Sequence, residues 1–394
     1  MLQPHFRQLS ALVSDANAKS VGNALTQIFS SKDSSFIPIA ESFRGLAGSS
    51  ELNKALDEMQ PALFKGVTIS QENNMVRVQD ALSYRFQDQL NRVHCISVKS
   101  SADRKQTECS RDNHMFHVWI DGLGDNLHQG HRFYAGSSHV GYQTNMGGVV
   151  AGVEDHFASY FTAGIMGAYT NSLTKWNKDQ GKEVDQTGYA GVYLSALGDL
   201  FYGNASVIGG WSHFHGHRNI LYPGVDLSAS NSHGGAQILS HLDSGLNLGW
   251  KGFTVRPFDS LDYISQMENS FTESGAGLWN LHVQKSNAIL LRNELGLQFA
   301  GCFCIGEGTW SLSPKISWVR EVRIKGSHYK AEFEGTDVPF VVTGYFPDRS
   351  LVSPGVILSG MMWKDLLSLE LYYNGEFAYK YSNHSYGGQL RYGF

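Results

Sequence analysis

A two-residue alternation of apolar and polar side chains, recurring through residues 111–394, most constrains the fold of this chain. In the segment 311–318, Leu312, Ile316 and Trp318 alternate with serines and a lysine, and segments 291–299 and 367–374 repeat the pattern. This period puts apolar side chains on one face of a strand and polar ones on the other. A sheet over a soluble core gives the same alternation, so the pattern predicts strands and leaves their surroundings open.

The lengths of the connections between strands favour a membrane barrel. Twelve strands are expected, near 115–124, 144–155, 159–170, 186–198, 201–213, 235–249, 252–265, 287–300, 308–320, 353–363, 366–377 and 384–394. Their junctions are short on one side, whereas on the other they are long and polar, at 125–143, 171–185, 214–234, 266–286 and 321–352, with 378–383 as the exception. Outer-membrane barrels combine short periplasmic turns with long extracellular loops, and an even number of strands closes such a barrel with both ends on the periplasmic side.

Composition agrees with this prediction. Charged residues make up 17% of the chain, against roughly 25% in soluble proteins, and 43 glycines, 18 tyrosines and 22 phenylalanines are present. Mean hydropathy is −0.25, and no run of about 18 apolar residues predicts a transmembrane helix. The net charge of −5 argues against a nucleic-acid partner. No motif for a cofactor or a metal is evident; Cys95 and Cys109 could form a disulfide in an oxidising compartment or remain thiols.

Residues 1–110 differ from the rest, because their apolar residues recur at helical spacing. One helix is expected around residues 18–28, a second from residue 52 toward Pro61, and a third over 70–92, where Met75, Val78, Leu82 and Phe86 share a side. We therefore divide the chain into a helical linker (1–64), a pore helix with its connection (65–110) and a barrel (111–394).

The C-terminal strand carries a more specific signal. Phe394, Tyr392, Leu390 and Tyr386 alternate on one face, and this pattern resembles the signal read by the outer-membrane barrel-assembly machinery. It predicts that the last strand runs toward the periplasm, with the N-terminal helix beneath the pore that it enters. Residues 1–5 do not form a signal peptide. Since a barrel must be exported, we expect that the start is missing or that the chain is a fragment.

Several blocks resemble the translocator domain of autotransporters (type V secretion), from about Ala16 to Phe394. Segments 15–25 and 52–62 resemble the helices that precede such barrels, and 148–154 resembles a Gly-x-x-x-Gly-x-Asp strand with Glu154 at the acidic position. Further matching blocks are 271–276, 291–296, 312–318 and 372–377. The glycine-rich, aromatic-rich sequence and its histidines resemble the chlamydial polymorphic membrane proteins in particular.

The resemblance implies a twelve-stranded antiparallel barrel in the bacterial outer membrane, with an α-helix in its lumen. It implies a non-enzymatic protein that exports an N-terminal passenger to the cell surface without ATP or cofactor, and anchors it there. The implied partners are outer-membrane lipid, the barrel-assembly machinery, periplasmic chaperones and the chain's own passenger. A helix suits a channel because it satisfies its own backbone hydrogen bonds; a periplasmic helix outside the barrel is the alternative.

Some autotransporters cleave themselves between two asparagines of the pore helix, assisted by lumen acids. Here Asn73 would be the nucleophile, Asn74 would follow the broken bond, and Glu154, Glu294 or Glu370 would be the candidate acids. Two adjacent asparagines also suit a helix boundary, so this structural explanation stays open.

The remaining polar and aromatic residues receive structural interpretations. His213, His215 and His217 share a strand face and could hold a metal, although a solvated extracellular loop is favoured. We expect an interfacial girdle of aromatic side chains at Trp119, Trp318, Trp363, Tyr142, Tyr169, Tyr345, Tyr373 and Tyr392. Arg292, Glu294, Glu370 and Arg391 are assigned to the lumen, because a charge facing lipid at mid-depth costs about 2–4 kcal/mol. The rival functions are a general porin, a membrane-embedded hydrolase and an adhesin presented on the loops.

Overall fold

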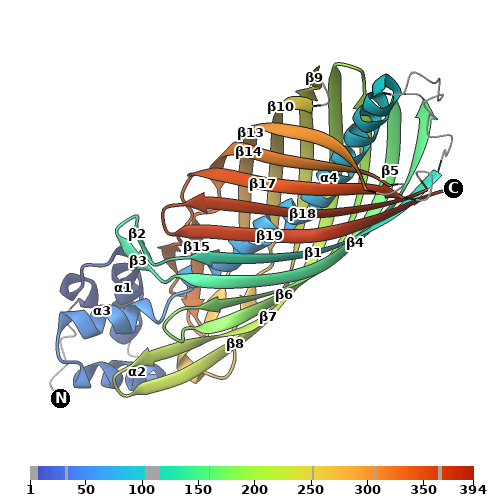
Figure 1. Cartoon of the computed structure of the whole chain (residues 1–394). Helices are drawn as coiled ribbons and strands as arrows, with labels where there is room; N and C mark the ends of the chain where they lie inside the picture. Colours follow the sequence, from blue (N-terminus) through green and yellow to red (C-terminus); the bar gives the residue numbers. More distant parts are fainter. Residues whose placement is uncertain are drawn as a thin grey trace, which may run out of the picture.

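The structure, a computed structural model, describes residues 8–31, 34–102, 116–158, 160–250, 253–305, 308–362 and 366–394. It has two parts, a long β-barrel with a helix inside and a cluster of short helices over one end (Figure 1). We call the end that carries Phe394 the turn end and the opposite end the loop end. Residues 8–64, which form the cluster of short helices, are called the helical cap.

The barrel confirms the predicted strands. Within the described residues, twelve long strands form one antiparallel sheet, closed by the pairing of β13 with β10 and of β1 with both β19 and β4. They are β1 (Phe116–Gln129), β4 (Tyr142–Ala158), β5 (Phe161–Trp176), β6 (Gly181–Leu197), β7 (Phe201–Tyr222), β8 (Val225–Leu246), β10 (Phe253–Glu268), β13 (Ser286–Ile305), β14 (Gly308–Lys325), β17 (Arg349–Met362), β18 (Leu367–Ala378) and β19 (Tyr381–Gly393). A short strand, β9 (Leu248–Trp250), continues the β8 side against β10.

Two of the predicted long loops are strand instead. The β5–β6 and β7–β8 pairs continue through most of 171–185 and 214–234, and the second pair ends at a tight turn with Gly224 at φ +83°. Buried and exposed side chains alternate along these extensions as they do in the rest of the wall, although both faces are polar. The other long junctions hold small strands: β2 (Arg132–Tyr134), β3 (Ser137–His139), β11 (Phe271–Thr272), β12 (Leu281–Val283), β15 (His328–Phe333) and β16 (Phe340–Thr343), with η5 (Gly277–Trp279).

The helical cap lies on the loop end, far from Phe394 (Figure 1). It comprises η1 (Leu9–Leu12), α1 (Ala16–Ser30), η2 (Ser34–Phe36), α2 (Ile37–Ser42), η3 (Phe43–Gly45), α3 (Ser49–Asp57) and η4 (Ala62–Phe64). Asp15 caps α1 by accepting hydrogen bonds from the backbone N–H groups of Asn17 and Ala18. The apolar faces of α1 and α3 share one buried core with β12, β15 and β16. The sequence predicted the N-terminal helix beneath the pore, at the turn end. For the helices of the cap this prediction is wrong, because their apolar faces are buried against the small strands at the loop end.

The lumen contains α4 (Lys65–Ala102), which runs from the loop end to the turn end (Figure 1). Its 38 residues span about 57 Å at 1.5 Å per residue, longer than the predicted 70–92. The alternative of a helix outside the barrel is thereby excluded. No helix among the described residues is both long and apolar enough to cross a bilayer.

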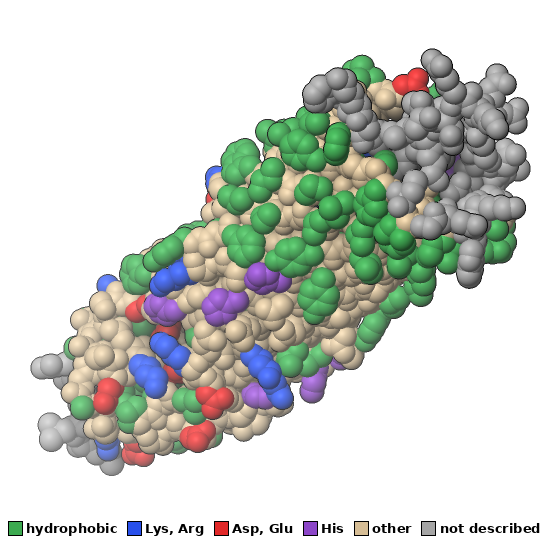
Figure 2. Space-filling model, in the orientation of Figure 1, with side chains coloured by type: hydrophobic (Ala, Val, Ile, Leu, Met, Phe, Trp, Pro, Cys, Tyr) green, Lys and Arg blue, Asp and Glu red, His purple; other side chains and the backbone are tan. Residues whose placement is uncertain are grey.

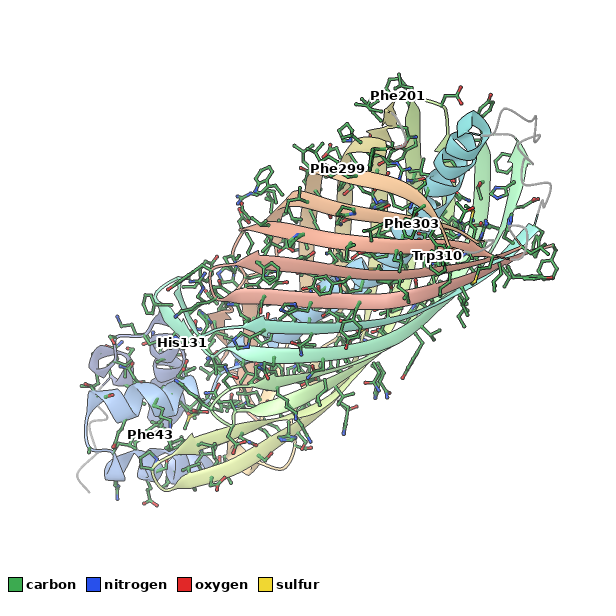
Figure 3. The ribbon with its side chains drawn as sticks, viewed as in Figure 1. Phe43, His131, Phe201, Phe299, Phe303 and Trp310 are labelled. Atoms are coloured by element: carbon green, nitrogen blue, oxygen red, sulfur yellow. The ribbon has the colours of Figure 1, made fainter. Side chains whose placement is uncertain are left out.

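The outer surface changes character along the barrel axis. On the face shown in Figure 2, hydrophobic side chains cover the half near the turn end, whereas lysines, arginines, acids and histidines gather toward the loop end and the cap. Phe201, Phe299 and Phe303 point outward from the wall nearer the turn end (Figure 3). An apolar band with aromatic side chains is the surface that a barrel presents to lipid.

The predicted aromatic girdle is partly correct. Four of its members are exposed on the outer wall: Tyr169, Trp318, Tyr373 and Tyr392. Trp119 and Tyr142 are buried instead, and Tyr345 accepts a hydrogen bond from Arg132 at the loop end. Trp119 faces inward because it has the same parity on β1 as the buried His117 and Asp121, whereas Val118 and Ile120 face outward. Trp363 lies outside the described residues.

Candidate functional site: the helix-filled lumen

A buried ion pair joins α4 to the barrel wall near the loop end. Glu72 of the helix is paired with Arg323 of β14, and the Arg323 guanidinium also stacks 4.2 Å from the Phe346 ring centroid. One turn earlier, the Thr68 hydroxyl donates a 2.7 Å hydrogen bond to Glu268 of β10. These contacts fix the first turns of the helix in depth and rotation, because a charge removed from water needs its partner in place.

A second group of charges lies in the middle of the lumen. The Arg77 guanidinium of α4 donates 2.7 Å and 2.8 Å hydrogen bonds to Glu376 of β18 and to Asp80 of the helix itself. Arg292 of β13 donates to the same Glu376 oxygen at 2.7 Å. Glu376 therefore joins an arginine of the helix to an arginine of the wall, with all three side chains at most 3% exposed.

Nearer the turn end, Arg85 of α4 pairs with Glu154 of β4, whose second oxygen accepts a 3.1 Å hydrogen bond from Tyr193. Asp88 lies 3.8 Å from the guanidinium of Arg391 on β19. The side chains of Arg292, Glu294, Glu370 and Arg391 are all buried in the lumen, as predicted. Burying these charges without partners would be costly, so the filled lumen is stable only when the charges of the helix and of the wall are matched.

Between the charged groups, an apolar seam joins helix and wall. Met75, Val78, Leu82 and Phe86 share a side of α4, as predicted. They form one buried cluster with apolar side chains of the wall, among them Trp119, Met146, Val150, Tyr193, Ile208, Leu239 and Ile264. A helix with one apolar stripe and otherwise polar faces suits a lumen whose wall is also mixed.

Asn73 and Asn74 lie on α4 facing acids that the sequence did not single out. The Asn73 side-chain amide donates a 2.8 Å hydrogen bond to Asp125 of β1 and accepts one of 2.7 Å from Asn383. The Asn74 amide donates to Ser172 at 3.0 Å and to Asp185 of β6 at 3.4 Å. Asp125 is four residues after Asp121 on β1, so both side chains face the lumen. This even spacing is the sequence signal that could have identified Asp125.

The acids nominated from the sequence lie elsewhere. Glu154 pairs with Arg85, about 18 Å along the helix from Asn73 at 1.5 Å per residue. Glu294 accepts hydrogen bonds from Lys315 at 2.9 Å and Ser317 at 2.6 Å, and Glu370 accepts one from Ser359 at 3.1 Å. The structure thus brings Asn73 and Asn74 together with Asp125 and Asp185 and pairs the three glutamates with other groups. His213, His215 and His217 lie on a strand, on the outward-facing side of β7.

Comparison with known proteins decides the family. A sequence model of the autotransporter beta-domain matches residues 118–374, about two thirds of the chain. The chain belongs to the autotransporter beta-domain family. The translocator domain of the Neisseria meningitidis autotransporter NalP has a similar fold, with a TM-score of 0.57 and 14% identity over 80% of this chain and 98% of that one.

Two further solved autotransporter structures share the fold. The beta domain of the Bordetella autotransporter BrkA gives a TM-score of 0.53 at 14% identity, over 71% of this chain and all of that one. The transport unit of AIDA-I from Escherichia coli gives 0.50 at 12% identity, over 77% and 98% of the two chains. A search of curated proteins finds no match.

Family membership places this autotransporter domain in the bacterial outer membrane. It anchors an N-terminal passenger and exports it to the cell surface without ATP. The geometry supplies the physical means, since a polar wall can solvate a threading backbone and a finished helix satisfies its own backbone groups.

Proposed function

We propose that α4 is the segment that stays in the lumen when export is complete, and that it closes the channel. The observation that carries this proposal is the series of buried ion pairs along one helix, from Glu72–Arg323 through Arg77–Glu376 to Arg85–Glu154. Each pair joins the helix to a different strand, so the set defines one docked position. A general porin would need an open lumen, which disfavours that rival.

The direction of the helix supports the same proposal. The α4 helix begins at Lys65, directly after η4 of the helical cap, and runs from the loop end toward the turn end (Figure 1). With loops outside and turns in the periplasm, the cap lies on the cell surface as the end of the passenger region. Residues 1–64 then belong to the exported part, 65–110 to the plug and its connection, and 111–394 to the barrel.

Single-channel conductance in planar bilayers tests the plug. The whole chain should conduct rarely, whereas a variant that starts near Asn113 should form open channels. A second variant, Glu72→Gln with Arg77→Gln and Arg85→Gln, keeps the chain length and weakens three contacts, so its open events should become more frequent. Equal conductance of the whole chain and of both variants, each folded by heat-modifiability on gels, would refute the plug.

We also propose self-cleavage at Asn73, supported by its hydrogen bond to Asp125. The Asn73 side-chain nitrogen attacks its own backbone carbonyl carbon, and the peptide bond to Asn74 breaks. Asp125 takes the proton from the attacking nitrogen and delivers it to the departing backbone nitrogen of Asn74. The products are a C-terminal succinimide at Asn73 and a new amino terminus at Asn74, so atoms and charge balance.

Mass spectrometry of the folded protein tests this step. The expected result is a fragment that begins at Asn74, absent from Asn73→Ala and strongly reduced in Asp125→Asn. Asn91→Ala is the matched control, because Asn91 is also a buried asparagine of α4, hydrogen-bonded to Ser313 and Arg256. A chain that stays intact in the outer membrane, or cleavage that survives Asn73→Ala, would overturn the proposal.

The outward face of β19 supports recognition by the barrel-assembly machinery and delivery by periplasmic chaperones. Phe394, Tyr392, Leu390 and Tyr386 are all exposed on the outer wall. The backbone N–H of Phe394 donates a 3.0 Å hydrogen bond to Phe116, which closes the β1–β19 seam. Phe394→Ala should slow insertion into vesicles that contain the assembly machinery more than unassisted folding in detergent; equal slowing in both would indicate a purely structural role.

A further inference from the structure

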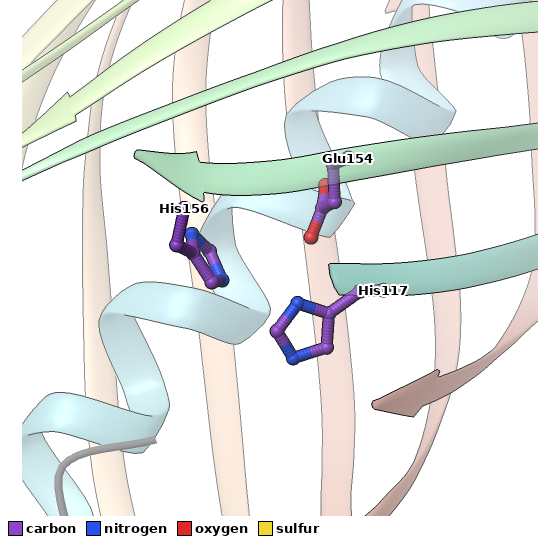
Figure 4. A group of neighbouring side chains, drawn as sticks. All are labelled: His117, Glu154 and His156. Atoms are coloured by element: carbon purple, nitrogen blue, oxygen red, sulfur yellow. The ribbon is translucent and has the colours of Figure 1, made fainter. Parts of the chain in front are cut away.

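Two histidines and a glutamate lie close together on the inner wall of the barrel (Figure 4). They are near the turn end, because the start of β1 pairs with Phe394. His117 is on β1, and Glu154 and His156 are on β4. The register puts His117 directly opposite Glu154, and His156 lies two residues beyond Glu154 on the same inward face. Side chains directly opposite each other on antiparallel strands start only about 5 Å apart at their Cβ atoms, so backbone pairing alone assembles the group.

The geometry of the three side chains is compact. A ring nitrogen of each histidine and a carboxylate oxygen of Glu154 all lie within 4.8 Å of one another. The two imidazole rings have centroids 4.7 Å apart. His117 and Glu154 are each 1% exposed, and His156 is half-buried with its Nδ1 2.5 Å from the Thr162 hydroxyl. Among the described residues, no other group of histidines, cysteines and acids converges in this way.

We propose that His117, Glu154 and His156 bind a divalent transition-metal ion, with Zn²⁺ as the best match. Two imidazoles and one carboxylate are a ligand set that Zn²⁺ accepts, leaving a fourth position for water. Zinc–ligand bonds of about 2.0–2.2 Å put tetrahedral ligand atoms roughly 3.4 Å apart, so modest side-chain rotations close the site. Because His156 Nδ1 faces Thr162, its Nε2 is the nitrogen assigned to the metal.

Glu154 can bind the metal ion and Arg85 at the same time, because its two carboxylate oxygens face different partners. One carboxylate oxygen faces Arg85 of α4 and the other accepts a hydrogen bond from Tyr193, so the metal would bind on the Tyr193 side and leave the arginine pair in place. Asp88 lies 3.7 Å from Arg85 and offsets the added positive charge. The ion would thus link β1 to β4 and fix the position of the carboxylate that pairs with Arg85 of the pore helix.

Metal titration of the full-length protein, folded in detergent and stripped with a chelator, tests the site. Zn²⁺ is added against a chromophoric chelator, and the expected result is one equivalent bound with micromolar or tighter affinity. His117→Ala and His156→Ala should each weaken binding by at least about tenfold. His213→Ala is the matched control, because this histidine is also on a barrel strand but faces outward, and it should leave the tight equivalent unchanged.

Cobalt(II) gives a second, independent readout. The full-length protein should develop visible absorption bands typical of a four-coordinate site, and these bands should be lost in His156→Ala but kept in His213→Ala. Heat-modifiability on gels confirms that each variant is folded before titration. The proposal is overturned if folded His117→Ala and His156→Ala bind Zn²⁺ like the parent protein, or if the parent shows no saturable binding at micromolar zinc.

Discussion

The ion pair between Arg77 of the pore helix and Glu376 of the wall should show a large pairwise coupling. The pair is 2.7 Å long, and its side chains are 3% and 2% exposed. A charge-assisted hydrogen bond in such a setting contributes about 1.5–3 kcal/mol. Arg77 keeps Asp80 at 2.8 Å and Glu376 keeps Arg292 at 2.7 Å when the other partner is removed. Arg77→Ala also removes the contact with the buried Asp125 at 3.8 Å, but this loss occurs in the single and in the double variant and therefore cancels in the cycle. We therefore expect a coupling near 2 kcal/mol, roughly thirtyfold in an equilibrium constant.

A double-mutant cycle measures this coupling directly. Arg77→Ala, Glu376→Ala and the double variant are folded in detergent micelles, and the free energy of unfolding is compared by denaturant titration. The control cycle uses Arg320 and Asp348, a pair 3.5 Å apart whose side chains are 40% and 46% exposed. Exposed pairs couple by about 0–1 kcal/mol. If the two cycles give the same coupling free energy, burial does not strengthen the lumen pairs and the reasoning is refuted.

Three further perturbations address the wall and the cap. A Cβ at Gly164 would lie 2.3 Å from the Tyr193 ring, whereas one at Gly147 meets nothing within 4 Å. Gly164→Ala should therefore cost about 1–3 kcal/mol and lower the temperature of the heat-modifiability transition, while Gly147→Ala should not. Asp15→Ala removes the α1 cap and an acceptor 2.9 Å from the Ser138 N–H, so limited proteolysis of the helical cap should become faster, and an unchanged rate would contradict this. Burial, with the charge of Asp15 next in importance, raises the pKa of Asp57 from 3.8 to about 7. The docked cap then holds a proton that the undocked carboxyl releases above pH 4, so docking should weaken as pH rises from 5 to 8. Asp57→Asn should flatten that proteolysis–pH profile; a profile identical to the parent's would count against the role of Asp57.

The sequence by itself determined the barrel. Lipid and lumen impose opposite requirements on successive residues of a strand, so alternation reveals each strand locally, and all twelve were placed near their observed positions. The lumen assignment of Arg292 and Glu370 follows from the same parity. Helical spacing likewise located α1, α3 and α4, because an apolar stripe is a local property of the chain.

The alternation was less informative where the lumen face and the outer face of a strand carry similar side chains. Trp119 suits an interface by chemistry, yet its register on β1 puts it in the lumen, where its indole N–H donates a 2.8 Å hydrogen bond to Tyr193. The loops at 171–185 and 214–234 were predicted from polarity, but a strand that extends beyond the lipid is polar on both faces and still pairs. Polarity alone cannot separate such a strand from a loop.

Only the tertiary structure decided which residues meet across the lumen. The position of α4 along the barrel axis sets Asn73 against Asp125 and Arg85 against Glu154, and a shift by one helical turn, about 5.4 Å, would change every partner. The same holds for His117 and His156, which are 39 positions apart and converge through the β1–β4 register. Strand alternation and helix periodicity are local and could be read from the sequence, whereas helix depth and strand register depend on all contacts at once.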